Sequence, residues 1–103
     1  MADKKWKQTE RKLAKLIGGE RIPVSGRQRG FSADIQHANF SIEVKERMTL
    51  PVWLHDAMNQ AEMSKRGDQI PLVILHQARQ KFDQSFAVMR LSDLIALSKK
   101  SED

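Results

Sequence analysis

The spacing of apolar side chains changes along this chain from the repeat of a helix to the repeat of a strand and back, and this succession constrains the fold most strongly. Residues 3–17 carry apolar side chains at helical spacing with charge elsewhere, which predicts an amphipathic helix. Gly18 and Gly19 end it, because glycine readily adopts the left-handed geometry of a helix C-terminus. Residues 40–47 begin with strict alternation of apolar and polar side chains, which predicts a strand.

The remaining elements follow from the same patterns and from the positions of Gly and Pro. Strands are expected at 20–24, 33–36, 71–76 and 85–90, the third of them buried, and helices at 51–66 and 93–98. Ser92 has the side chain of a helix N-cap, and the polar tail 99–103 is expected to be flexible. The order α-β-β-β-α-β-β-α predicts an α/β fold, a mixed central sheet flanked by helices, in one domain spanning residues 1–103.

Composition limits the chemistry and the location of the protein. The chain has 103 residues and no cysteine, which excludes a disulfide framework and a thiolate zinc site. The three histidines, His37, His55 and His76, are too scattered to indicate a histidine metal cluster. No apolar run is long enough to cross a bilayer. We therefore expect a protein of the cytoplasm of a bacterial, archaeal or phage-infected host cell, with no membrane partner.

Positive charge is concentrated near the N-terminus. The chain has 18 Lys and Arg against 13 Asp and Glu, a formal net charge of +5. Within residues 4–15, six basic residues surround a single acid, Glu10. Such a surface attracts polyanions through counterion release and predicts nucleic acid as a partner, with Lys7, Arg11 and Arg21 as candidate contacts. The alternative is a basic helix face that is simply solvated.

The segment SGRQRG, residues 25–30, is a second candidate for nucleic-acid contact. Arg27 and Arg29 stand between two glycines, and arginine forks match the geometry of phosphate oxygens. We expect a mobile basic loop that binds phosphates. The alternative is a disordered loop whose arginines have no such role.

The segment SADIQHANFSIEVKER, residues 32–47, combines residues typical of a metal site. Glu43 and Lys45 flank Val44, so in a strand they project from the same face. A hairpin turn near Asn39 would bring Asp34 to the same cleft. Two carboxylates and the backbone carbonyl of Val44 form a hard-oxygen site suited to Mg²⁺, or to Mn²⁺ in its place. The alternative is an exposed ion pair on a half-solvated sheet face.

These residues resemble the D-x(n)-E-x-K core of the PD-(D/E)XK nuclease superfamily. The order of elements over residues 5–97 is similar to that of archaeal-type Holliday junction resolvases and their phage relatives, which implies a restriction-endonuclease-like core. The resemblance implies that Asp34 and Glu43 are metal ligands and that Lys45 is catalytic. It also implies that Glu10, on the first helix, joins the metal site directly or through water. Where some members have proline before the aspartate, this chain has Ala33.

The resemblance adds three further candidates. Gln60 lies on the helix that follows the core, where several of these nucleases place a glutamine or lysine facing the site; an ordinary surface amide is the alternative. Arg11 matches a basic position of junction resolvases. Ser32 matches, more loosely, a family serine near the scissile phosphate. The three join the candidate catalytic and DNA-binding residues.

The resemblance therefore implies a Mg²⁺-dependent endonuclease that hydrolyses phosphodiesters in branched DNA, a Holliday junction resolvase. Because a four-way junction is cut in two strands, the enzyme is expected to be a two-fold homodimer with no small-molecule cofactor. A nuclease of the same fold acting on flaps, ends or duplex DNA is one alternative. A non-catalytic structure-specific DNA-binding protein is the other.

Overall fold

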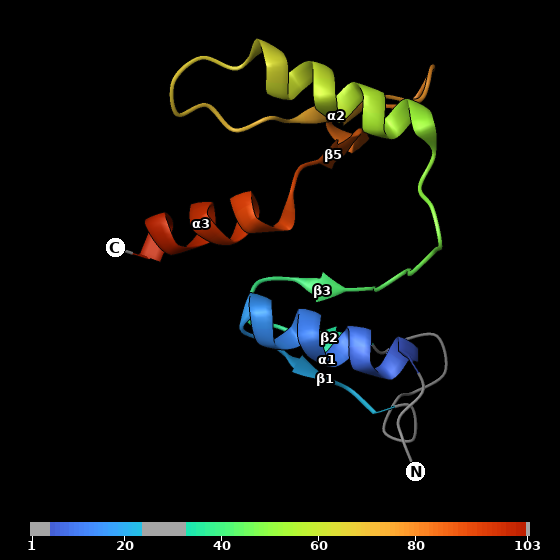
Figure 1. Ribbon diagram of the computed structural model, residues 1–103, viewed down its shortest axis with the longest axis vertical. Coiled ribbons are helices and arrows are strands. Elements are labelled where there is room, and N and C mark those ends of the chain that lie inside the picture. The colour runs from blue at the N-terminus through green and yellow to red at the C-terminus, as the bar shows by residue number, and fades with distance from the viewer. Residues whose placement is uncertain (1–4, 24–32, 103) are drawn as a thin grey trace. The chain divides into compact units, whose positions relative to one another are not determined.

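A computed structural model of the chain describes residues 5–23 and 33–102 (Figure 1). The elements follow the predicted order, with one short 3₁₀ helix added between the last two strands. They fall into two compact units, residues 1–48 and residues 49–103, and each unit is described by itself. The fold is α/β, with three α-helices and two small antiparallel sheets. Whether residues 1–103 form one domain stays a prediction.

The first unit is a helix packed on a three-stranded sheet. Helix α1 (Lys5–Ile17) precedes strands β1 (Glu20–Arg21), β2 (Ile35–Gln36) and β3 (Ser41–Ile42), which pair antiparallel in that order. Ala14 of α1 and Ile35 of β2 are buried, because α1 packs against β1 and β2. The buried residues of α1 are Glu10 and Ala14, whereas Leu16, part of the predicted apolar face, is 59% exposed.

Two glycines join α1 to the sheet in different ways. Gly18 has a φ of 79°, the left-handed conformation expected at the end of a helix. Gly19 lies against β2, so that a Cβ atom placed on it would stand 2.6 Å from the carbonyl oxygen of Gln36. No other residue type fits this approach without displacing the strand.

Two backbone hydrogen bonds hold the ends of the strands beside Asp34. Ile35 pairs with Arg21 on one side and with Ile42 on the other. Beyond these pairs, the N–H of Ile22 donates to the carbonyl of Asp34 and the N–H of Asp34 donates to the carbonyl of Ile42, each at 2.9 Å. Both neighbouring strands therefore fix the backbone of Asp34.

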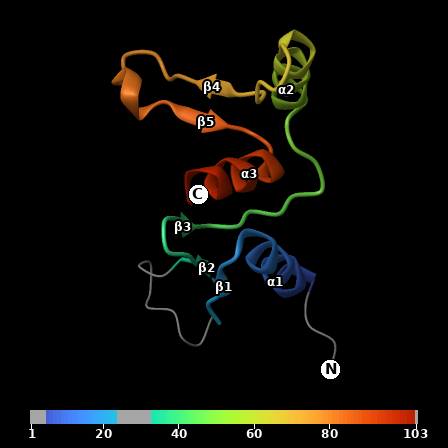
Figure 2. The same cartoon turned by 90° about the vertical axis from the view of Figure 1, so that its left-hand side faces the viewer.

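The second unit contains α2 (Val52–Ser64), a hairpin of β4 (Val73–Leu75) and β5 (Phe86–Val88), and α3 (Leu91–Glu102). The 3₁₀ helix η2 (Phe82–Gln84) lies in the hairpin loop, and Figure 2 shows the two strands side by side. Helix α2 packs against β4, and Met58 is its buried residue. None of the helices in the described part of the chain is both long and apolar enough to cross a membrane.

Several sequence predictions need correction. In place of one mixed sheet, the strands form two separate antiparallel sheets, because each strand pairs with its neighbours along the chain. The strand at 71–76 was expected to be buried, but Ile74 is 66% exposed. Ser92 is not the N-cap of the last helix, because α3 begins at Leu91. The same helix continues through Glu102, beyond its predicted end at residue 98.

Candidate active site

Glu10 is buried although every other charged residue of α1 is basic. It lies four residues before Ala14, so the two share the helix face that packs on the sheet. Only 6% of Glu10 is exposed. A buried carboxylate is costly unless it is paired or hydrogen-bonded, so its surroundings decide what it can do.

Arg21 of β1 is the charged partner of Glu10. Its Nε donates to Oε1 of Glu10 at 2.8 Å, and the side chains of Arg21 and Glu10 are 11% and 7% exposed. The guanidinium also lies over the indole ring of Trp6, 5.5 Å from the ring centroid. Such a charge-assisted bond in a water-poor setting is stronger than one at the surface.

Asp34 is the second buried carboxylate of the unit. It precedes β2, is 8% exposed, and its Oδ2 accepts a hydrogen bond from the backbone N–H of Val44 at 2.7 Å. This bond ties the aspartate to the residue between Glu43 and Lys45. Asp34 is therefore fixed both by its own backbone and by its carboxylate.

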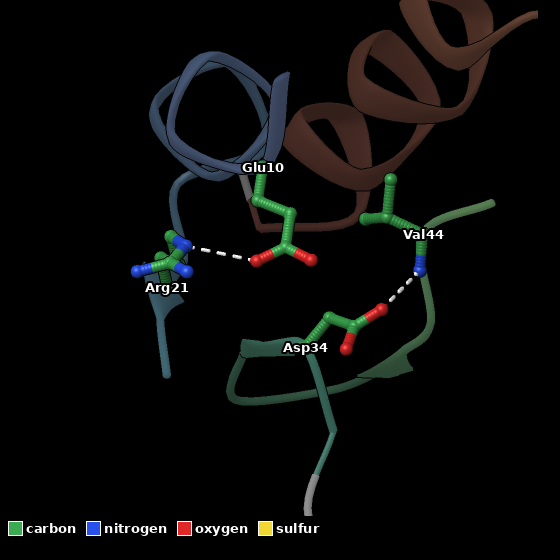
Figure 3. A network of polar contacts seen from close by, with 4 residues as sticks. All are labelled: Glu10, Arg21, Asp34 and Val44. Atoms are coloured by element: carbon green, nitrogen blue, oxygen red, sulfur yellow. Dashed lines mark hydrogen bonds and ion pairs between the residues drawn. The ribbon is translucent and has the colours of Figure 1, made fainter. Parts of the chain in front are cut away.

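Figure 3 shows the side chain of Glu10 extending from α1 toward the strands, and the carboxylate of Asp34 turned toward the N–H of Val44. Arg21 stands at the outer side of Glu10, and the N–H of Val44 stands at the outer side of Asp34. The two acids are 24 residues apart in the sequence, so the packing of α1 on the strands brings them together. That Glu10 joins the metal site stays a prediction.

Glu43 and Lys45 lie at the surface. Their side chains are 59% and 72% exposed, and Nζ of Lys45 is 3.9 Å from Oε2 of Glu43. The shared cleft was expected from a strand that continues to Arg47, but β3 ends at Ile42. Beyond that residue the alternation rule no longer fixes where side chains point. The geometry is that of the exposed ion pair considered as the alternative.

The chemistry of the buried pair fits a divalent cation. Carboxylate oxygens are the ligands that Mg²⁺ and Mn²⁺ prefer, and the backbone N–H of Val44, the residue after Glu43, donates to Asp34. Over residues 5–23 and 33–102, however, no three carboxylate or imidazole side chains gather closely enough to hold a metal ion. The structure thus brings together two of the three expected carboxylates.

The candidate DNA contacts lie in different surroundings. Arg11 is exposed on α1, whereas Lys7 is partly buried with its Nζ 5.5 Å from the centroid of Trp6. Arg21 is buried against Glu10, so it does not offer its charge to a surface ligand. The last three candidates, Arg27, Arg29 and Ser32, lie outside the described residues.

Gln60 belongs to the second unit, where it is exposed on α2. Its expected role beside the metal therefore stays a prediction. Trp53 is also exposed on this helix.

Sequence reasoning missed the pairing role of Arg21. The residue was grouped with surface cations because its neighbours in the sequence are polar or lie in a short strand. A lone acid on the inner face of a basic helix was the available signal, because a buried carboxylate needs a cation or hydrogen-bond donors nearby. That signal does not say which of the many basic residues is the partner.

Comparisons of the chain with protein-family models, with curated proteins and with solved structures found no match. The resemblance to PD-(D/E)XK nucleases therefore depends on residues 32–47, on Glu10 and on the order of elements.

Proposed function

We propose that the protein is a metal-dependent endonuclease that hydrolyses phosphodiesters in branched DNA, as a Holliday junction resolvase does. The observation that carries the proposal is the burial of two carboxylates, Glu10 and Asp34, in the unit that also carries residues 43–45. Burial of two acids is unfavourable for folding. A protein that merely binds a polyanion has no use for them, whereas a metal-dependent nuclease needs such ligands.

Each residue has a role in this proposal. Glu10, Asp34, Glu43 and the carbonyl of Val44 would hold the cation. Bound there, Mg²⁺ would supply a water of lowered pKa and would stabilise negative charge on the phosphate. Lys45 orients the attacking water or stabilises the charge that develops on the phosphate oxygens. Because Lys45 and Glu43 are exposed, both can approach a phosphate at the surface of the unit.

Branched DNA is the substrate class that the charge distribution and the family resemblance favour. The net charge is +5, and Lys12, Lys15 and Arg11 are exposed on α1. Contacts of this type recognise the phosphate backbone and the shape of the DNA, without reading its sequence. Two cuts in a four-way junction require two active sites, so the active form is a homodimer. Flaps, ends and duplex DNA remain the alternative substrates.

A second candidate function is structure-specific DNA binding without catalysis. Two observations favour it: Arg21 already compensates the charge of Glu10, and Glu43 pairs with Lys45 at the surface. In this case the acids stabilise the fold through hydrogen bonds, and the basic residues of α1 alone bind DNA.

Cleavage assays on defined DNA substrates separate the two candidates. The full chain is incubated with a synthetic four-way junction, a flap and a linear duplex, with Mg²⁺ or with EDTA. The nuclease is expected to cut the junction in Mg²⁺ alone. Binding to the junction without any product in Mg²⁺ or Mn²⁺ would favour the second candidate and contradict the first.

The variant Asp34→Asn tests the site. Asparagine keeps an oxygen that accepts the N–H of Val44, so the fold is preserved while a charged ligand is lost. Cleavage by this variant is expected to fall by about 100-fold or more. Loss of a metal ligand should reduce activity at least as much as loss of a residue that only orients a ligand. Glu43→Gln and Lys45→Ala should also lose cleavage.

Gel-shift binding of the junction in EDTA should survive Asp34→Asn, because the change reduces repulsion of the phosphates. Asp68→Asn is the matched control, since Asp68 is an exposed acid of the second unit. It should cut at the parental rate. Equal cleavage by the parent, Asp34→Asn and Glu43→Gln would show that the assigned residues are wrong.

A further inference from the structure

The guanidinium of Arg21 is buried, yet it uses little of its hydrogen-bonding capacity. Nε makes the 2.8 Å bond to Glu10, while Nη2 is buried without a hydrogen-bond partner. A guanidinium usually engages a carboxylate through two parallel bonds. A buried donor without an acceptor lowers stability, so hydrogen bonding alone does not explain why the chain buries this residue.

The charge of Arg21 offers a better explanation. Glu10 and Asp34 are both buried acids of the same unit, so each is costly unless a cation or hydrogen-bond donors are near. Arg21 is a cation within bonding distance of Glu10, and the ring of Trp6 adds a cation–π contact that holds it there.

We propose that Arg21 substitutes for the divalent cation beside Glu10 when no metal is bound, and that it competes with the metal for this carboxylate. The inference rests on the proposed function, because it takes Glu10 and Asp34 as the metal ligands. Arg21 is thereby a positioning residue. It keeps Glu10 in place in the absence of metal and weakens the affinity of the site for the ion.

Electrostatics gives the direction of the effect. A divalent ion bound to Glu10 would stand close to the guanidinium, and the repulsion of these like charges acts through a medium of low dielectric constant. Removal of the guanidinium therefore strengthens metal binding while it weakens the metal-free fold. If Arg21 only supported the fold, its removal would lower the stability of the protein equally with and without metal.

Manganese binding to the full chain tests the proposal. The free Mn²⁺ remaining in a titration is measured by electron paramagnetic resonance for the parent, Arg21→Gln and Lys12→Gln. Lys12 is an exposed residue of α1, so its variant has the same net charge as Arg21→Gln. Arg21→Gln is expected to bind Mn²⁺ on the order of tenfold more tightly than the parent, and Lys12→Gln within about twofold of it.

Thermal unfolding supplies a second measurement. Mn²⁺ should raise the midpoint of Arg21→Gln more than that of the parent, since a ligand stabilises the state that binds it. Arg21→Lys keeps the charge and should bind Mn²⁺ like the parent. Unchanged or weaker Mn²⁺ binding by Arg21→Gln would overturn the proposal, and so would an Arg21→Gln variant that stays unfolded at every Mn²⁺ concentration.

The proposed function can fail separately. A parent that cuts the junction in Mg²⁺, together with an Arg21→Gln variant of parental Mn²⁺ affinity, would remove the role of Arg21 and leave the nuclease intact. A parent that neither cuts DNA nor loses Mn²⁺ binding on Asp34→Asn would contradict the proposed function itself.

Discussion

Glu10 is the residue whose environment departs most from its sequence context. Its ion pair with Arg21 is nearly inaccessible to water, so screening weakens it little. Glu10→Gln keeps an amide oxygen that accepts the Nε–H of Arg21 but leaves the arginine charge uncompensated. We expect this variant to lose about 2 kcal/mol of unfolding free energy, somewhat less than a full truncation of a buried pair costs. Urea denaturation in EDTA measures the loss.

Glu20→Gln is the control for this prediction. Glu20 carries the same charge at the start of the same sheet but is exposed. Its substitution should change the unfolding free energy by less than about 0.5 kcal/mol. Equal losses of unfolding free energy in the two variants would mean that burial of the Glu10–Arg21 pair contributes nothing to stability.

At the residue scale, the sequence predicts the types of the site residues better than their partners. Asp34 and Glu10 are both buried, and their role as metal ligands stays a prediction. The bond from Arg21 to Glu10 could not be predicted, because it depends on the rotamers of two long side chains. The exposure of Glu43 also could not be predicted, since alternation indicates a strand without saying where the strand ends.

At the element scale, Gly19 decides how closely α1 approaches β2. Gly19→Ala would place a methyl group 2.6 Å from the carbonyl oxygen of Gln36 and 2.8 Å from Cγ2 of Ile35, so backbone must shift. We expect a loss of about 2–3 kcal/mol, typical of overpacking against atoms that cannot move aside. Thermal or urea unfolding checks this value.

Gly18→Ala is the comparison at the neighbouring position. Gly18 has a φ of 79° and open space around its Cα, so alanine there suffers backbone strain alone. Such strain costs about 1–2 kcal/mol. A Gly18 variant less stable than the Gly19 variant would show that the close approach to β2 is not the stronger constraint.

Helix boundaries were predicted more accurately than the sheet. The glycine after α1 and the proline before α2 mark a helix end and a helix start through local backbone preferences. Both helices therefore begin and end within a few residues of the expected positions. Strand pairing depends on residues far apart in the sequence. The alternating pattern therefore predicted strands near 35 and 42 but neither their two-residue lengths nor their division into two antiparallel sheets.

At the scale of the whole molecule, charge is the property that bears on the partner. The excess of basic residues predicts binding to DNA whose strength falls steeply with salt, because each neutralised phosphate releases counterions. This dependence does not require knowledge of how the two units are placed. It also holds for either candidate function, so it tests the binding surface independently of catalysis.

The double variant Arg27→Ala/Arg29→Ala tests which part of the chain supplies these contacts. If both arginines bind phosphates, the plot of log affinity against log salt should become less steep by about two units, at 0.9 for each contact. Junction binding without metal, measured from 50 to 200 mM NaCl, gives this slope. Arg66→Ala/Arg90→Ala removes the same charge from exposed positions of the second unit and should leave the slope near the parental value. Equal slopes in the two double variants would mean that net charge, and not the segment 25–30, sets the affinity for DNA.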